Sequence, residues 1–588
     1  MKKNYFILLL AFMFATNILK AETEPNDSKA QANALALTVA DVGTVSLTES
    51  DWFSVTIPED GDLNIELTSS VNTYIQILDN NGTTSLLNAY ALGTVTRTVS
   101  GLAAGTYYVR LYNYYAFENS NYTITATLTS TGLANDVEYN GSVPTAITLP
   151  LNGSVTGHVN YYYNNERDTT DWYAVTVNED GKLSYTITSN GQNLYGKLFD
   201  GDGITELAGS YVTTSATYFR DGLAPGTYYI KIYTYYSYEY IAYTLSNTLT
   251  PPVNANDPVA NEIYSNATVL PLNSSITGHI GFRYNGNVDV YDWYSVTTNA
   301  DGALSFTITV DNSNNVYAEL FDGDGTTELN GNYTTTTATY TEDGLAVGTY
   351  YIRIRTFYTT EFASYILSNN LTEPLQSNDS SPNETFGAAT PFSLNSSVTG
   401  HIGYAYNGAD DLLDWYAITT TDDGKITFSI TSHNNQNVYA ELFDGDGTTE
   451  LAGSYSTSTG TYEKDGLAAG TYYIRIRNFY NSEWAPYTLS NSIEYPVQTN
   501  DAEPNGTAAT GVPYTPGTTV TGHIGYSYAG ADDLEDWYAV TLPADGKFTW
   551  SITSHNNQNV YARLYDSNGS TLLGGSYTTS TATYTENN

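Results

Sequence analysis

A repeat of about 120 residues constrains the fold of this chain more than any other feature of its sequence. The tripeptide Asp-Trp-aromatic occurs five times, with its tryptophans 120–122 residues apart at Trp52, Trp172, Trp293, Trp415 and Trp537. In each copy an Asp-Gly turn and an apolar segment follow, and the first four copies continue with Gly-Leu-Ala-x-Gly-Thr-Tyr-Tyr. Such a period is too long for a solenoid repeat and has the size of an independent domain. The sequence therefore predicts tandem domains.

The recurring motifs divide the chain into a leader and five modules. We predict a signal peptide at 1–21 and modules one to five at 22–130, 131–252, 253–374, 375–496 and 497–588. Short polar linkers, most of them containing proline, join the modules at 250–256, 373–378 and 495–500. Module five stops before the Gly-Leu-Ala and Thr-Tyr-Tyr segments of the other copies. We therefore expect it to be truncated, and expect a longer gene product that could include a catalytic or anchoring domain.

Within each module, polar and apolar residues alternate as they do in β-strands. In segment 171–177, Tyr173, Val175 and Val177 alternate with Trp172, Ala174 and Thr176, which is a period of two with one apolar face. Enrichment in Thr, Tyr, Val and Ile and closely spaced glycine turns favour many short strands. The prediction is an all-β chain, a tandem array of β-sandwich, jelly-roll-like domains with the fifth truncated.

The N-terminus has the pattern of a secretory signal peptide. Lys2 and Lys3 precede a largely apolar run from Tyr5 to Ala15, and Ala21 stands before an acidic segment. The run is too short for a membrane span, and no other segment is continuously apolar. We predict a secreted or cell-surface protein with no membrane span in the mature chain.

Two features of the composition limit the functions open to the chain. It has no cysteine, which excludes disulfides, thiolate metal sites, a cysteine nucleophile and a lipoprotein anchor. It has 62 acidic against 20 basic residues and a net charge of −42. Nucleic acid is therefore excluded as a partner, because binding it needs clustered positive charge. Such acidity favours solubility and divalent cations, although solvation alone would explain it equally well.

Two acidic motifs recur about thirty residues apart in most modules. The first lies in the linker, as in Glu22-Thr23-Glu24-Pro25-Asn26-Asp27, and the second is Asp-x-x-Asp before Trp-Tyr, as in 168–173. Ca²⁺ prefers six to eight oxygen ligands from carboxylates, amides and the backbone. The motifs therefore predict structural calcium sites. The alternative is that these residues only cap turns and solvate linkers, since Asn, Asp and Pro are ordinary turn formers.

At these motifs the chain resembles a known family, the bacterial pre-peptidase C-terminal domain, whose relatives include the collagen-binding domains of clostridial collagenases. The resemblance rests on Glu-Pro-Asn-Asp at 24–27, the Asp-Trp-aromatic tripeptides, and Gly-Leu-Ala-Ala-Gly-Thr-Tyr-Tyr at 101–108 and 466–473. It implies β-sandwiches of a kind commonly appended to secreted peptidases. It also implies that the linker Glu-x-Glu-x-Asn-Asp and the Asp-x-x-Asp before the tryptophan bind calcium.

Carried over position by position, the resemblance implies calcium ligands in every module. They are Glu22, Glu24, Asn26, Asp27 and Asp51 in module one; Asp136, Glu138, Asn140, Asp168 and Asp171 in module two; Asp257, Asn261, Asp289 and Asp292 in module three; Asp379, Asn383, Asp411 and Asp414 in module four; and Asp501, Glu503, Asn505, Asp533 and Asp536 in module five. Thr48 replaces the first Asp of the pair in module one, and Gly141 and Gly506 replace the last linker Asp in modules two and five. Modules three and four have Val259 and Ser381 at the second acidic position and keep Glu262 and Glu384 at the last one. Calcium is thus better supported in modules one, two and five.

Two other recurring motifs favour structural roles. The Asp-Gly-Asp-Gly segments at 200–203, 322–325 and 444–447 suit hairpin turns better than calcium loops, because they lack the later ligands of an EF-hand. One histidine per module recurs in Thr-Gly-His, at His158, His279, His401 and His523. We predict strand residues that make a local hydrogen bond rather than metal ligands or catalytic groups.

The outward face of the Thr-Tyr-Tyr strand is a candidate ligand-binding surface. It carries Tyr108 and Arg110, Tyr229 and Lys231, Tyr351 and Arg353, and Tyr473 and Arg475. Aromatic-rich loops follow at 112–117, 233–240, 357–362 and 479–487. Tyrosine and arginine are favoured at binding surfaces. The alternative is a cross-strand ladder that pairs each arginine with acidic neighbours.

No motif in the sequence predicts catalysis. His-Glu-x-x-His, Gly-x-Ser-x-Gly and phosphate-cradling glycine loops are all missing from it. We predict a secreted, non-catalytic, multivalent binding or adhesion array with calcium-stabilised modules and an extracellular protein or polysaccharide as its ligand. The alternatives are a structural stalk, or the accessory region of a secreted peptidase or other hydrolase whose catalytic domain lies outside this chain.

Overall fold

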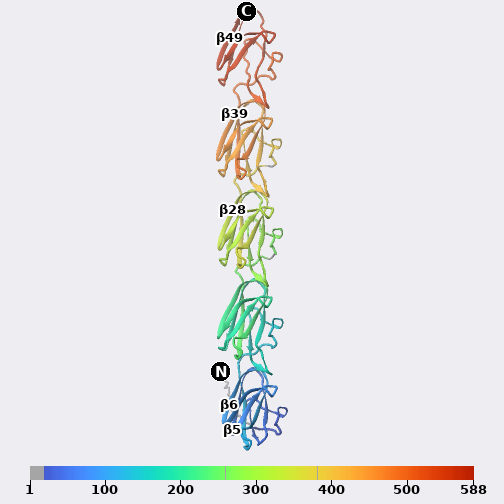
Figure 1. Cartoon of the computed structure of the whole chain (residues 1–588). Coiled ribbons are helices and arrows are strands. Elements are labelled where there is room, and N and C mark those ends of the chain that lie inside the picture. Colours follow the sequence, from blue (N-terminus) through green and yellow to red (C-terminus); the bar gives the residue numbers. More distant parts are fainter. Residues whose placement is uncertain (1–18, 258–259, 380–381, 588) are drawn as a thin grey trace, which may run out of the picture.

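The chain forms a row of β-sandwich modules that follow one another along a single axis (Figure 1). The computed structural model describes residues 19–257, 260–379 and 382–587. Most of the predicted signal peptide, together with Val259 and Ser381, lies outside the described residues. Within these ranges the regular structure is strand, apart from four short 3-10 helices, so the predicted all-β fold is confirmed. No helix in the described part of the chain is long and apolar enough to cross a membrane.

Module two consists of two mainly antiparallel sheets whose inner faces form one core. Its elements are η2 (Val143–Thr145), β9 (Ile147–Thr148), β10 (Ser154–Val159), β11 (Tyr162–Tyr163), β12 (Glu166–Arg167), β13 (Thr170–Val177), β14 (Gly181–Ser189), β15 (Leu194–Phe199), β16 (Glu206–Val212), β17 (Ser215–Leu223), β18 (Gly226–Thr234) and β19 (Ile241–Thr250). One sheet has the order β16-β15-β18-β13-β9, in which the short β9 runs parallel to β13, and the other begins β10-β19-β14-β17.

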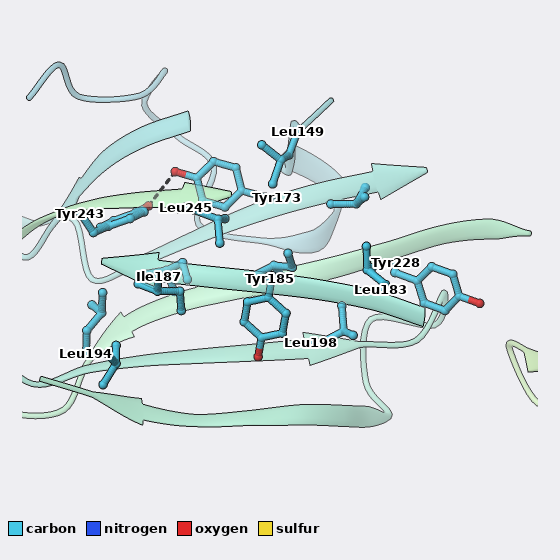
Figure 2. Close-up of a cluster of buried hydrophobic side chains, with 14 of the residues drawn as sticks. Leu149, Tyr173, Leu183, Tyr185, Ile187, Leu194, Leu198, Tyr228, Tyr243 and Leu245 are labelled. Atoms are coloured by element: carbon cyan, nitrogen blue, oxygen red, sulfur yellow. Dashed lines mark hydrogen bonds between the residues drawn. The ribbon is translucent and has the colours of Figure 1, made fainter. Parts of the chain in front are cut away.

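The alternation seen in the sequence fills the space between the two sheets. On β14, Leu183, Tyr185 and Ile187 are buried, and the residues between them are half-buried. Figure 2 shows these three side chains packed with Leu198 and Tyr228 from the facing strands β15 and β18. Buried aliphatic and aromatic side chains of this kind stabilise a fold by about 1.5–3 kcal/mol each.

Modules three and four repeat this architecture. Module three has η3 (Tyr264–Asn266), β20 (Thr268–Val269), β21 (Ser275–Ile280), β22 (Arg283–Tyr284), β23 (Asn287–Val288), β24 (Asp292–Thr297), β25 (Gly302–Val310), β26 (Val316–Phe321), β27 (Glu328–Thr334), β28 (Thr337–Leu345), β29 (Thr349–Thr356) and β30 (Ala363–Thr372). Module four has η4 (Phe386–Ala388), β31 (Thr390–Pro391), β32 (Ser397–Ile402), β33 (Ala405–Tyr406), β34 (Ala409–Asp410), β35 (Leu413–Thr420), β36 (Gly424–Ser432), β37 (Val438–Phe443), β38 (Glu450–Ser456), β39 (Thr459–Leu467), β40 (Gly470–Asn478) and β41 (Ala485–Glu494).

Modules one and five depart from the pattern. Module one has β1 (Lys20–Ala21), η1 (Lys29–Gln31), β2 (Asn33–Ala34), β3 (Ala40–Val45), β4 (Asp51–Ile57), β5 (Gly61–Leu78), β6 (Ser85–Leu102), β7 (Gly105–Asn113) and β8 (Ser120–Ser130). Its β5 pairs with β8 through its first half and with β7 through its second, so this long strand joins the two sheets. Module five has β42 (Val512–Tyr514), β43 (Ser527–Tyr528), β44 (Ala531–Asp532), β45 (Tyr538–Val540), β46 (Lys547–Thr553), β47 (Val560–Tyr565), β48 (Leu572–Thr578) and β49 (Thr581–Asn587).

Each later module donates a β-hairpin to a sheet of the module before it. Hairpin β22–β23 of module three extends the β10-β19-β14-β17 sheet of module two, with Arg283 paired to Leu223. Hairpins β11–β12, β33–β34 and β43–β44 make the same connection at the other three junctions. The modules therefore share sheets across their boundaries, which the domain prediction did not include.

A tyrosine of the donated hairpin packs into a gap left by glycines of the preceding module. Tyr284 lies against Gly201 and Gly226, which leave no room for a Cβ, and its ring meets Tyr228 edge-on at 5.4 Å. The backbone N–H of Asn285 donates to Asp200 Oδ1 at 2.9 Å. Asp200 lies in the predicted Asp-Gly-Asp-Gly turn between β15 and β16, so this turn also anchors the next module.

The recurring histidines make the predicted hydrogen bond within their own module, because Nε2 of His279, His401 and His523 lies 2.7–2.8 Å from the carbonyl oxygen of Asn254, Gln376 and Gln498. Their other ring nitrogen reaches across the same junctions. His279 Nδ1 lies 2.7 Å from Asp180 Oδ2 of the preceding module, and His158, His401 and His523 make the same contact with Asp60, Asp301 and Asp423. The partners stand about 100 residues earlier in the chain and both members are largely buried. A strand pattern cannot reveal such a contact, because the partner belongs to another module.

Removing the hairpin tyrosine should loosen a junction without unfolding either module. In Tyr284→Ala, loss of a half-buried aromatic ring should weaken docking of β22–β23 by about 1–3 kcal/mol. Hydrogen exchange of the β22–β23 amides should accelerate by about tenfold or more. Tyr211→Ala, which removes an exposed tyrosine on β16 of module two, is the matched control. Equal exchange rates in both variants would contradict this account of the junction.

Candidate metal centre at the module junctions

The backbone brings the two acidic motifs together at the start of the Asp-Trp strand. The N–H of Trp172 donates to the carbonyl oxygen of Asn140 at 3.0 Å. Trp52, Trp293, Trp415 and Trp537 make the same bond to Asn26, Asn261, Asn383 and Asn505, at 2.9–3.0 Å. The linker is thereby tied to the strand some thirty residues later, so the sequence motifs meet in space in every module.

In module two, four of the predicted ligands form a buried cluster of oxygens. Asn140 Nδ2 donates to Asp136 Oδ2 at 2.7 Å. The hydroxyl of Tyr173 bonds to Asp136 Oδ2 and to the hydroxyl of Tyr243, and Tyr243 donates to Asp171 Oδ2. Figure 2 shows the Tyr173–Tyr243 bond at the edge of the core.

The donors to Asp136 and Asp171 reach only one oxygen of each carboxylate and leave the other without a partner among the described residues. Asp136 Oδ1, Asn140 Oδ1, Asp168 Oδ2 and Asp171 Oδ1 are buried and accept no hydrogen bond from the described residues. Leaving buried polar groups unpaired costs about 1–3 kcal/mol each, and more for charged groups. A cation bound among these four oxygens would satisfy all of them at once.

Burial and mutual repulsion raise the pKa values of these carboxyls. Burial, followed by the neighbouring acids, raises the pKa of Asp136 to about 6 and of Asp168 to about 7. The pKa of Asp171, which is wholly buried, is raised well above its ordinary value, chiefly by burial and then by Asp136 and Asp168. Glu138 is exposed but lies close enough to raise all three pKa values. Concentrated negative charge without a counter-charge is what a divalent cation would neutralise.

Module four has the same arrangement, although its linker lacks the second acidic residue. Asp379 Oδ1, Asn383 Oδ1, Asp411 Oδ1 and Asp414 Oδ1 are buried and without a hydrogen-bond partner among the described residues. Tyr487 donates to Asp414 Oδ2 at 2.6 Å. Burial, then Asp379 and Glu384, raises the pKa of Asp411 to about 7.

In module three the cluster opens into a cavity at the junction. The cavity has a volume of about 330 Å³ and is lined by Asp257, Asn261, Glu262, Asp289 and Asp292, together with Asp180 of module two. Tyr365 donates to Asp292 Oδ2 at 2.5 Å, and Tyr294 to Asp257 Oδ2 at 2.9 Å. Glu262 stands at the last position of the linker motif, where module three keeps an acidic residue. Asp180 was not among the predicted ligands and could not have been found from the motif, because it comes from the preceding module.

In module one three predicted ligands meet. Oxygens of Glu22, Glu24 and Asp51 lie within 4.8 Å of one another, and Asn26 Oδ1 and Asp51 Oδ1 are buried without partners among the described residues. Burial raises the pKa of Asp51 to about 8, with a contribution from Glu22. Asp27 is exposed and lies outside the cluster.

In module five Asp501, Glu503 and Asp536 form the corresponding cluster, within the same 4.8 Å. Asn505 is buried, and its Oδ1 has no partner among the described residues. Burial and neighbouring acids raise the pKa of Asp533 to about 6 and of Asp536 to about 7. The structure thus brings the linker motif and the aspartates before the tryptophan together in all five modules.

Sequence reasoning missed the buried tyrosines that orient the cluster. They are Tyr173 and Tyr243 in module two, Tyr294 and Tyr365 in module three, Tyr416 and Tyr487 in module four, and Tyr122 in module one. The signal was available, because the third residue of Asp-Trp-Tyr and the tyrosine of the Tyr-Thr-Leu-type strand both recur.

The predicted Tyr/Arg face lies on the outer side of the Thr-Tyr-Tyr strand, where its residues are half-buried. In module three, Arg353 and Arg355 both pair with Glu319, and in module four Arg475 and Arg477 both pair with Glu441. In modules one and two, Arg110 lies over Trp52 and Lys231 over Trp172. The cross-strand ladder is therefore present in modules three and four, and its arginines are already satisfied.

Comparison with protein families identifies the first module. Residues 49–113 match the model of the bacterial pre-peptidase C-terminal domain. This segment belongs to that family. The pre-peptidase C-terminal domain is a non-catalytic accessory domain, and the resemblance predicted from the sequence is confirmed where the model matches.

Solved structures with some likeness to the chain include another pre-peptidase C-terminal domain. The domain from the collagenase of Bacillus anthracis is 16% identical to this chain and has a TM-score of 0.15. The match covers 19% of this chain and 100% of that domain. The PBSX exported protein XepA is 12% identical over 36% of this chain and 87% of its own, with a TM-score of 0.13. The N-terminal CBM22-1–CBM22-2 tandem of Xyn10C from Paenibacillus barcinonensis is 8% identical over 38% and 92%, with a TM-score of 0.14. No curated protein matches the chain.

Proposed function

We propose that the chain is a secreted, non-catalytic, multivalent binding array whose modules are stabilised by calcium. The observation that carries the calcium part is the group of four buried, unpartnered oxygens in modules two and four. An anionic cluster already oriented by tyrosine hydroxyls offers hard oxygen ligands to a hard cation. Zn²⁺ is less suited, because among the described residues no histidine or cysteine belongs to the clusters.

In the metal-bound state, calcium would supply positive charge and bridge the linker to the Asp-Trp strand. The chain's own residues hold the site in shape. The Asn140 carbonyl fixes the strand start through Trp172, and Tyr173 and Tyr243 position one oxygen of Asp136 and of Asp171. Because Asp180 lines the cavity of the next module, a cation there would also brace the junction.

The repeated architecture supports the binding part of the proposal. Several similar modules on one chain raise avidity by making later contacts intramolecular, with gains of about 10²–10⁴ over a single weak site. Hairpin donation at the junctions holds the modules in one row, so their equivalent faces are presented at regular intervals (Figure 1). The same junctions favour the second candidate, a structural stalk, which differs in predicting no ligand.

Calcium titration of the full chain tests the metal sites. Isothermal titration calorimetry should detect saturable Ca²⁺ binding at several sites and much weaker Mg²⁺ binding, since Mg²⁺ demands a tighter octahedral shell. Asp171→Asn together with Asp414→Asn should reduce the stoichiometry by two. Glu179→Gln together with Glu328→Gln removes two exposed charges outside the clusters and should leave it unchanged. No saturable heat at millimolar calcium would refute the sites.

A further inference from the structure

One exposed aromatic cluster recurs at the same place in each of the first four modules. In module two it lies at the end of β18 and beside β15, where the rings of Tyr233, Tyr195 and Tyr235 stack in series at 4.9 and 5.2 Å. Tyr236 meets Tyr235 edge-on at 4.6 Å and stacks on Tyr238 at 5.2 Å with an interplanar angle of 11°. The stack projects outward, since Tyr238 is 71% exposed and Tyr236 42%.

The other modules build the same cluster with small variations. Module one uses Tyr112, Tyr74, Tyr114, Tyr115 and Phe117, the last of which is 76% exposed. In modules three and four an arginine begins the stack. Arg355 lies 3.8 Å over Tyr317, which stacks on Phe357 beside Tyr358, and Arg477 lies 3.7 Å over Tyr439, which stacks on Phe479 beside Tyr480.

Core packing does not explain these rings. Their side chains lie outside the four buried hydrophobic clusters of the modules. Each aromatic cluster leaves apolar ring surface exposed to water, and exposed aromatic patches mark sites of interaction. Tyr90, Tyr211, Tyr333 and Tyr455 on the neighbouring strands add further exposed rings of 49–57%. In module one, Tyr74, Tyr90 and Arg97 line a groove of about 470 Å³ beside the stack.

We propose that these aromatic clusters are platforms for a neutral polysaccharide, an inference that rests on the proposed binding function. The C–H face of a pyranose ring stacks flat on an aromatic ring, and the tyrosine hydroxyls at the platform edge can bond to sugar hydroxyls. Because the rings hold one another by stacking, little side-chain freedom is lost when a sugar binds. The proposed site therefore lies at the strand end, beyond the Tyr/Arg face, whose arginines in modules three and four are already paired with glutamates.

The net charge of the chain and the regular spacing of its modules favour a neutral polysaccharide as the ligand. A net charge of −42 repels acidic polymers, so an uncharged polysaccharide is favoured over an acidic one. The modules repeat along one row in Figure 1, so equivalent strand ends recur at one-module intervals. A regular row of flat platforms suits a polymer of identical ring-shaped units, whereas a folded protein would need complementary shape and charge at each point of contact.

Affinity electrophoresis of the full chain in calcium tests the proposal. The gels contain hydroxyethylcellulose, glucomannan or neutral xylan, and we expect at least one polymer to retard the chain. The variant Tyr115→Ala, Tyr236→Ala, Tyr358→Ala, Tyr480→Ala should weaken that retardation by tenfold or more. The control is Tyr108→Ala, Tyr229→Ala, Tyr351→Ala, Tyr473→Ala, which alters the strand face and should change it less than twofold.

The outcomes separate this inference from the proposed function. Undiminished binding in the cluster variant, or loss in the strand-face variant alone, would overturn the site. Retardation by no neutral polysaccharide overturns the ligand class, and binding to immobilised fibrillar protein in a parallel assay would then preserve the binding function. Failure in both assays overturns the binding function as well. Calcium-dependent melting, measured on both variants, verifies that each is folded.

Discussion

Removing calcium at pH 8 should lower the melting temperature of the chain by about 10 °C. The reason is that a cation that binds only the folded state stabilises it by about 2.7 kcal/mol when its concentration is about a hundred times Kd. The effect has a second source. Without the cation, the buried oxygens of Asp136, Asp168 and Asp171 repel one another and lack donors. Differential scanning fluorimetry of calcium-free and calcium-loaded protein measures the difference, with Mg²⁺ as the matched control.

The difference in melting temperature between calcium-loaded and calcium-free protein should also depend on pH. Since the pKa values of Asp136, Asp168 and Asp411 are raised to about 6–7 from 3.8, the folded metal-free chain holds protons that the unfolded chain releases. Stability without calcium therefore falls as the pH rises from about 4 to about 7. Calcium competes with those protons, so its stabilising effect should be small at pH 5 and grow through pH 7. An equal calcium effect at pH 5 and pH 8 would contradict the proposed sites.

The variant Asp171→Asn should change the sign of its effect with calcium. In calcium-free protein at pH 8 it should stabilise module two by about 1–3 kcal/mol, because it removes a buried negative charge beside Asp136 and Asp168. In calcium it should be destabilising by a similar amount, because the site loses a charged ligand. Hydrogen exchange of β13 and β19, read with and without calcium, reports the local stability of this module.

The control for this variant is Glu179→Gln, which removes the same charge at an exposed position of module two. It should shift exchange equally in both conditions, and only slightly. If Asp171→Asn destabilises module two regardless of calcium, the carboxylate is a structural hydrogen-bond acceptor for Tyr243 and not a metal ligand.

Most of the fold could be predicted from the sequence, because the burial of a β-strand appears directly as a period of two. The buried faces of β13 and β18 are those expected from the alternation around Tyr173 and Ile230. The acidic motifs also came together, because the Asn140 carbonyl binds the N–H of Trp172. Long-range pairing could not be predicted. Nothing in the composition of β22–β23 distinguishes a hairpin that stays in its own module from one that joins the previous module, as this hairpin does.

Two further contacts could not be predicted, because a local sequence pattern does not identify the partner residue. The contact of His279 with Asp180 joins residues about a hundred positions apart. The pairing of Arg353 and Arg355 with a single Glu319 depends on the register of β26 against β29. In the continuous β5 of module one, Ser69 and Thr73 bond to each other and to Ser120 at a register shift, where the other modules leave the strand.

Hairpin donation from each module to the one before it favours folding of the modules in order along the chain. The acceptor strands β6, β17, β28 and β39 all precede their donor hairpins in the chain, so during synthesis each acceptor strand emerges before its hairpin. Neighbouring modules of similar sequence are prone to exchange strands as they fold. Here each newly emerging module meets a finished template that fixes its register, so the row assembles in order from its N-terminal end.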